Sequence, residues 1–214
     1  MVTGLYEPLE HSVRTGVSWE EYERVLEQFE SESCRARITY NQGQMEVTTM
    51  GDKHERAKAA IGRLIETYGI ERDIPVNCLG SVTLRRQDLL KGLEPDECFY
   101  VTTPLPPVPD ELGAPLDLSI HPPPDLAIEV DITKTSIPRQ PIYAALGIRE
   151  VWRYDGQSLV FLKRTRDGRY EPTQYSTLLP RLSSNDLDPF VQMALNQSPH
   201  AAAKALRDWV RKQS

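Results

Sequence analysis

The chain has 214 residues, of which 39% are hydrophobic and 26% are charged. These values are ordinary for a soluble globular protein, and the length suits one α/β domain, or a domain with a small appendage. No segment approaches the roughly 18 consecutive apolar residues that cross a membrane, and the N-terminus lacks a basic-then-apolar signal pattern. Three widely spaced cysteines, Cys34, Cys78 and Cys98, predict a reducing cytoplasm and neither a disulfide framework nor a zinc cluster.

The net charge of −6 argues mildly against a nucleic-acid-binding protein, but the charge is unevenly distributed. Residues 51–132 carry 8 Lys and Arg against 15 Asp and Glu, whereas residues 133–214 carry 13 against 7. An acidic centre beside a basic C-terminal third fits a metal site next to a surface that contacts phosphates. Ordinary solvated faces also carry such charge blocks.

The first 50 residues predict an arm, a helix and a β-hairpin. Residues 1–17 show no clear pattern and are interpreted as an N-terminal arm. Ser18, followed three residues later by a glutamate, is typical of a helix start, and this helix runs to about Glu30. Alternating polar and apolar residues on both sides of an Asn-Gln-Gly turn predict a hairpin over residues 35–49.

A second helix carries the first two candidate site residues. It is predicted to begin at Asp52 as the N-cap and to end at Gly69, with an apolar stripe on one face. His54 and Glu55 lie in its first turn, where both side chains can line a cleft. Glu55 also stands where a capping box places a glutamate, so a purely structural role is the alternative.

Short strands and a proline-rich loop follow. Residues 74–79, 82–86 and 98–101 predict three strands. Asp96 stands at the start of the third strand, where turn chemistry around the preceding proline would also explain it. Residues 102–124 hold 8 of the 17 prolines, and a loop of this length is typically functional or mobile.

The strand predicted over residues 126–132 organises the chain, because two acids interrupt its apolar sequence. Glu129 and Asp131 are two residues apart, so both side chains leave the same face of the strand. Burying them as unpaired anions would cost several kcal/mol. Two carboxylates about 7 Å apart on one face can share a hard cation. The alternative is an edge strand whose acids are merely solvated.

The rest of the chain predicts a strand–helix–strand unit and two C-terminal helices. A helix over residues 137–146 links strand 126–132 to strand 150–154, for which a right-handed parallel crossover is the default. Helices are predicted over residues 185–195 and 199–212. The last helix has an apolar stripe that can pack on the body or on a second subunit.

Taken together, four features resemble the putative restriction endonuclease family expanded in photosynthetic bacteria, within the PD-(D/E)XK nuclease superfamily. The features are the hairpin with Gly43 and Glu46 followed by His54-Glu55, then Pro95-Asp96, the segment Pro124 to Val130, and the segment Ile142 to Trp152. The resemblance covers about residues 18–185. It implies an α/β (α+β) fold with a restriction-endonuclease-like mixed central sheet flanked by helices. Residues 18–185 would form the nuclease-like domain, with an arm over 1–17 and a C-terminal helical appendage over 186–214.

The resemblance also implies a catalytic site. Asp96 matches the first motif acid, Glu129 the second, and Glu55 the helix acid that assists the metal. These residues would hold Mg²⁺ or Mn²⁺, which activates a water and neutralises charge on the scissile phosphate.

One position departs from the family pattern. A lysine normally stands two residues after the second acid, but this chain has Asp131 there. Asp131 can serve as an extra metal ligand, and Lys134 is the nearest substitute for the lysine. Arg139 suits the role less well, because a guanidinium is a poor base, although it can clamp a phosphate. The other interpretation is that catalysis has been lost.

The predicted function is therefore a cytoplasmic, divalent-metal-dependent endonuclease that acts on DNA, with no membrane partner. A homodimer is expected, because two cuts in a duplex suit two-fold symmetry. The first alternative is a catalytically inactive nuclease-fold module that binds DNA or a protein partner. The second is a structural protein, in which Glu129 and Asp131 would be exposed and far from Asp96.

Overall fold

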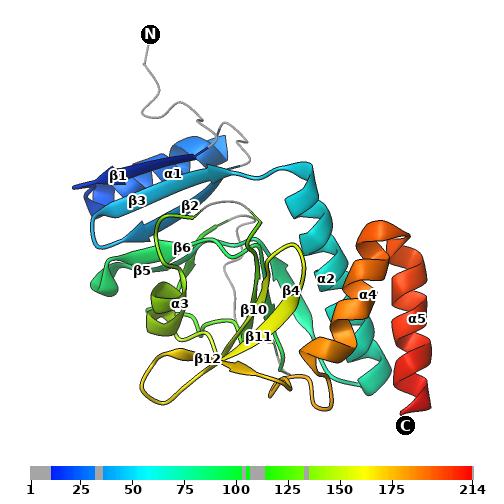
Figure 1. The fold of residues 1–214 in the computed structure, drawn as a ribbon. Helices are drawn as coiled ribbons and strands as arrows, with labels where there is room; N and C mark the ends of the chain where they lie inside the picture. Colours follow the sequence, from blue (N-terminus) through cyan, green and yellow to red (C-terminus); the bar gives the residue numbers. More distant parts are fainter. Residues whose placement is uncertain (1–10, 32–35, 103–104, 107–113, 133–134, 214) are drawn as a thin grey trace.

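The structure, a computed structural model, describes residues 11–31, 36–102, 105–106, 114–132 and 135–213. Within these residues the strands form two six-stranded sheets, each containing parallel and antiparallel pairs (Figure 1). This mixed sheet architecture with flanking helices confirms the predicted fold class. The first ten residues of the predicted arm, together with Cys34 and Lys134, lie outside the described residues.

The first sheet is built around the predicted hairpin. Its strands, in spatial order, are β1 (His11–Thr15), β3 (Gln44–Thr49), β2 (Ala36–Asn41), β6 (Lys91–Leu93), β5 (Leu84–Arg86) and β8 (Leu116–Asp117). A short 3₁₀ helix, η1 (Gln87–Leu89), joins β5 to β6. Strand β1 pairs with β3, so part of the predicted arm is a strand that the sequence pattern did not indicate.

Helix α1 (Trp19–Ser31) packs on this sheet through aromatic side chains. Trp19, Tyr22 and Tyr40 are buried, and the rings of Tyr22 and Tyr40 stack with centroids 4.8 Å apart. Ser18 Oγ accepts the Glu21 backbone N–H at 3.1 Å, which confirms the predicted helix start.

The second sheet contains the organising strand. Its order is β12 (Tyr170–Thr173), β11 (Leu159–Arg164), β10 (Glu150–Tyr154), β9 (Leu126–Val130), β7 (Glu97–Tyr100) and β4 (Asn77–Gly80). Strands β9 and β10 are parallel and are connected through α3 (Gln140–Leu146), which confirms the predicted strand–helix–strand unit. Glu129 lies beside Arg153 in this register.

Helices cover both faces of the second sheet. Helices α2 (Asp52–Arg72), α4 (Ser184–Asn196) and α5 (Pro199–Lys212) lie together over one face, with α5 leading to the C-terminus (Figure 1). That face buries Ile128 and Val130, whereas Ala127 belongs to the core on the α3 side. Because alternate residues of a strand point to opposite faces, Glu129 also points to the α3 side.

Helix α2 differs from the prediction at both ends. Gly51 is its N-cap, in place of Asp52, and the helix continues through Gly69 to Arg72. A Cβ at Gly69 would lie 2.6 Å from Val76 Cγ2, so this glycine permits close packing of the following segment. Asp73 takes the left-handed conformation that ends the helix, with a φ of 54°.

The organising segment is also shorter than predicted. Strand β9 ends at Val130, so Asp131 lies just beyond it, and α3 begins at Gln140 instead of residue 137. Helix α3 ends at Gly147, where a φ of 92° confirms the predicted stop. Among the described helices, none is long and apolar enough to cross a membrane.

Candidate active site

The candidate active site lies near the carboxyl end of β9, where the two sheets meet. Glu129 is only 6% exposed, and its side chain is held by residues from other elements. Glu129 Oε1 accepts hydrogen bonds from Arg139 Nε at 3.1 Å and from the Tyr143 hydroxyl. Arg139 directly precedes α3 and Tyr143 lies within it, so the crossover helix fixes the orientation of this carboxylate.

Asp96 is placed beside Glu129 by the backbone. The Asp96 N–H donates to the Ile128 carbonyl at 3.1 Å, which extends the pairing of β7 with β9 by one residue. Asp96 Oδ2 accepts the Val130 N–H at 2.6 Å, and Asp96 is 3% exposed. The two motif acids predicted from the sequence are therefore neighbours in a buried site.

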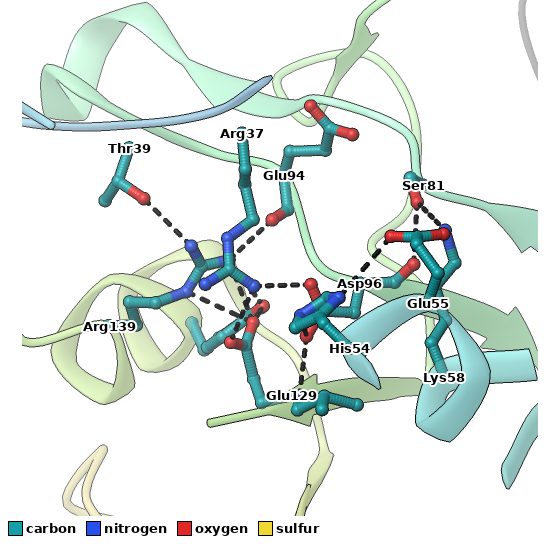
Figure 2. A network of polar contacts seen from close by, with 12 residues as sticks. Arg37, Thr39, His54, Glu55, Lys58, Ser81, Glu94, Asp96, Glu129 and Arg139 are labelled. Carbon is teal, nitrogen blue, oxygen red and sulfur yellow. Dashed lines mark hydrogen bonds and ion pairs between the residues drawn. The ribbon is translucent and has the colours of Figure 1, made fainter. Parts of the chain in front are cut away.

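Two arginines lie among these acids (Figure 2). Arg37, from β2 in the first sheet, pairs with Asp96 Oδ1 through Nη1, and the same nitrogen lies 3.4 Å from Glu129 Oε2. Arg139 also donates to Thr39 Oγ1 at 2.9 Å and to the Glu94 carbonyl at 2.5 Å. These contacts join both sheets through one cluster of opposite charges.

Burial and the neighbouring arginines shift the pKa values of the acids in opposite directions. Burial alone would raise the pKa of Asp96, but Arg37 and His54 lower it below its usual value. Burial raises the pKa of Glu129 in spite of Arg139 and Arg37. Burial also raises the pKa of the neighbouring Glu94 to about 7. The site therefore contains acids whose ionisation is displaced by their surroundings, which is common where acids have a chemical role.

The first turn of α2 contributes a further group of residues (Figure 2). His54 is buried, and its Nε2 lies 3.1 Å from Asp96 Oδ2. The Glu55 side chain is 44% exposed and lies 3.5 Å from Lys58 Nζ, which donates to Ser81 Oγ at 2.8 Å. Glu55 therefore lies at the rim of the site, and its predicted role as a metal ligand stays a prediction.

Asp131 lies beside Glu129 on the α3 side but pairs with a different arginine. Its Oδ2 lies 3.4 Å from Arg153 Nε, and its side chain is 34% exposed. Both acids line a cavity of about 380 Å³ together with Arg139 and Arg153. This agrees with the predicted common face, although Asp131 lies beyond the strand. Its catalytic role and that of Lys134, which is not described, stay predictions.

A second cavity borders Asp131 on the other side. It measures about 550 Å³ and is lined by Lys53 and Arg56 from the start of α2, and by Tyr154 from the end of β10. In open α/β sheets, ligands commonly bind outside the carboxyl ends of parallel strands. Asp131 thus stands between two cavities at that end of β9 and β10.

Comparison with known proteins identifies the family of the chain. Residues 19–196 match the model of a family named Uma2, described as "Putative restriction endonuclease". The chain belongs to this family. The family predicted from the sequence motifs is confirmed.

A solved structure shares the Uma2 chain's fold. It is the crystal structure of a putative nuclease from Anabaena variabilis ATCC 29413, with a TM-score of 0.52 and 15% sequence identity. The similarity covers 72% of this chain and 90% of that chain. The search of curated proteins finds no match. At this level of identity the structural likeness supports the fold.

Several site residues of the Uma2 chain escaped the sequence analysis. Arg37 falls within the hairpin predicted over residues 35–49, and the sequence pattern did not single out Glu94. The sequence suggested Arg139 as a weak substitute for the missing lysine and as a possible phosphate clamp, but not its contacts with Glu129. No local pattern marks Arg37, because its partners lie 59 and 92 residues further along the chain.

Proposed function

We propose that this Uma2-family chain is an endonuclease that hydrolyses phosphodiester bonds in DNA, using Mg²⁺ or Mn²⁺ held by Asp96 and Glu129. The observation that carries the proposal is the convergence of both carboxylates on one cationic nitrogen, Arg37 Nη1. Two buried acids that meet at one cation also suit a metal ion at that position. Mg²⁺ commonly binds through one or two carboxylates and completes its shell with waters and substrate phosphates.

The residues present fit such an ion in number and chemistry. Hard cations prefer carboxylate oxygens, and Asp96 and Glu129 supply them from adjacent strand ends. Among the described residues, no group of three or more His, Cys, Asp and Glu side chains is arranged to hold a metal. Asp131 and Glu55 are therefore proposed only as ligands that would have to move toward the two buried acids.

When bound, the ion would supply an activated water and stabilise negative charge on the scissile phosphate. The protein's own side chains would orient the substrate and the acids. Arg139 and Tyr143 hold Glu129 Oε1 in place. Arg139 and Arg153 also line the cavity beside Glu129, where guanidinium groups can bind a backbone phosphate.

A second function is favoured by a separate observation. Every carboxylate oxygen of Asp96 and Glu129 already accepts a contact from an arginine, a tyrosine or the backbone. Asp131 stands where the family has a lysine. Both facts suit a module that binds DNA, or a protein partner, without cleaving it.

Cleavage of supercoiled plasmid separates these two functions. The purified protein is incubated with Mg²⁺ or Mn²⁺, with EDTA as one control and the Glu129→Gln variant as another. Glu150→Gln is the matched variant, because Glu150 is also a buried acid and lies on the adjacent strand. We expect metal-dependent nicking that is lost in Glu129→Gln and retained in Glu150→Gln. Folded protein that binds the plasmid but does not nick it in either metal would instead support a module that binds DNA without cleaving it.

A further inference from the structure

Arg37 occupies the point at which the two buried acids face each other. It is 5% exposed and extends from β2 of the first sheet to the acids of the second sheet (Figure 2). Its Nη1 contacts Asp96 Oδ1 and lies 3.4 Å from Glu129 Oε2. The other oxygen of each acid is engaged elsewhere, by the Val130 N–H and by Arg139. Arg37 is thus the group that contacts the two oxygens facing each other, Asp96 Oδ1 and Glu129 Oε2.

The charges in this cluster are already balanced. Asp96 and Glu129 face Arg37 and Arg139, and all four side chains are buried. A divalent cation added beside Arg37 would meet a like charge in surroundings that screen it weakly. Its ligands would also be the oxygens that Arg37 uses. Arg37 and a metal ion therefore cannot both occupy the space between the acids.

We propose that Arg37 is a built-in competitor of the metal and becomes a phosphate ligand when the metal displaces it. This inference rests on the proposed metal site at Asp96 and Glu129. When the metal binds, Arg37 Nη1 leaves Asp96 Oδ1 and Glu129 Oε2, and the cation takes its place on these two oxygens. The released guanidinium lies next to the site and has lost its contacts with Asp96 and Glu129. A DNA phosphate replaces them, because guanidinium forms strong paired hydrogen bonds with phosphate.

The consequence is coupling between metal and DNA. Without DNA, the metal must displace a buried, paired guanidinium, and the metal affinity is low. With DNA bound, a phosphate stabilises the displaced Arg37, and the metal affinity rises. By linkage, the metal raises the affinity for DNA by the same factor. The site then favours metal binding when substrate is present.

The test measures Mn²⁺ binding by electron paramagnetic resonance of the free ion. It compares the native protein with Arg37→Met, which keeps a long side chain and removes its charge. Arg85→Met is the matched control, because Arg85 lies in the same sheet but pairs with Glu23. We expect Arg37→Met to bind Mn²⁺ about ten to a hundred times more tightly, as follows from losing one or two charge-assisted contacts. Arg85→Met should match the native protein.

A phosphorothioate-substituted duplex, which resists cleavage, tests the coupling. It should raise the Mn²⁺ affinity of the native protein several-fold and that of Arg37→Met little. Equal Mn²⁺ affinities for the native protein and Arg37→Met would overturn the inference and leave the proposed metal site intact. Failure of both folded proteins to bind Mn²⁺ at millimolar concentration would overturn the metal site and the inference together.

A spectroscopic measurement does not depend on the folding of Arg37→Met. The guanidinium ¹⁵N–¹H signal of Arg37 in the native protein is assigned by its loss in Arg37→Lys. We expect this signal to shift, and its protons to exchange faster, when Mg²⁺ is added. A signal unchanged at saturating Mg²⁺ would show that Arg37 stays on the acids and would overturn the inference.

Discussion

Glu129 and Glu150 are buried acids on neighbouring strands of one sheet, yet their surroundings differ in kind. Glu150 is 0% exposed and begins β10, whereas Glu129 lies near the end of β9. Glu150 accepts hydrogen bonds from neutral donors, including Trp152 Nε1 at 3.1 Å and Ser176 Oγ at 2.8 Å. Glu129 is instead held by two arginines and a tyrosine and lines a cavity.

The comparison distinguishes a structural acid from a candidate catalytic one. The donors to Glu150 include residues 176 and 177, so this acid anchors the loop that leads into α4. The partners of Glu129 come from the first sheet and from the crossover segment, and two of the three carry positive charge. Burial alone therefore does not distinguish the two acids; the charged partners from separate elements and the adjoining cavity are what make Glu129 the candidate.

Replacing Glu129 or Glu150 with glutamine gives the largest expected difference in nicking rate. Glu129→Gln should lower the plasmid-nicking rate by about 10³-fold, because a charged group at the reaction centre is removed. Glu150→Gln should keep its activity per folded molecule but lose about 1–3 kcal/mol of unfolding free energy, because the amide cannot accept all the existing hydrogen bonds. Nicking rates and urea denaturation of both variants check this. Similar losses of nicking activity in both variants would contradict the distinction between a catalytic Glu129 and a structural Glu150.

Arg139 tests whether charged partners matter beyond stability. Arg139→Gln should reduce nicking by about 10²-fold, because Glu129 loses its orientation and the cavity loses a phosphate-binding group. Arg139→Lys should recover part of the rate, since it restores charge without the planar fork. Each rate is measured together with thermal unfolding of the same variant. Full activity in Arg139→Gln would show that the arginine contributes to stability and not to the reaction.

The sequence predicted more of the fold than of the site, for a physical reason. Helix starts, hairpin turns and the apolar strand depend on neighbouring residues, and α5 was predicted at its observed bounds, Pro199–Lys212. The end of α2 was misplaced because Gly69 serves packing against Val76, a contact that no local pattern reveals.

The sequence singled out Asp96 just before one strand and Glu129 within another, and the structure brings these two acids together. Arg37 was missed because its role depends on how the two sheets meet. The same dependence explains why Arg139 was undervalued: its contacts with Thr39 and Glu94 join residues far apart in sequence.

Glu94 tests the cost of burying a charge in this cluster. Burial raises its pKa in the folded protein to about 7, above the usual value of about 4.5. As the pH rises from about 4.5 to 7, the unfolded chain releases this proton first, so the free energy of unfolding falls across that window. Glu94→Gln should remove a fall of about 2–3 kcal/mol. Urea denaturation in EDTA at pH 5, 6, 7 and 8 measures it, and parallel curves for both proteins would refute the assignment.

Substitution of Asp131 has the smallest expected effect, and it tests whether an acid must be buried to be essential. It lines both cavities, but it is partly exposed and pairs with Arg153 at the surface. Surface ion pairs contribute about 0–1 kcal/mol, so Asp131→Asn should barely change stability. If Asp131 only borders the substrate path, nicking should change by no more than about threefold, and the lower negative charge should favour DNA binding. A loss of nicking as large as that of Glu129→Gln would instead indicate that Asp131 is a metal ligand. It would show that a partly exposed acid at the position of the family's lysine can be as essential as the buried Glu129.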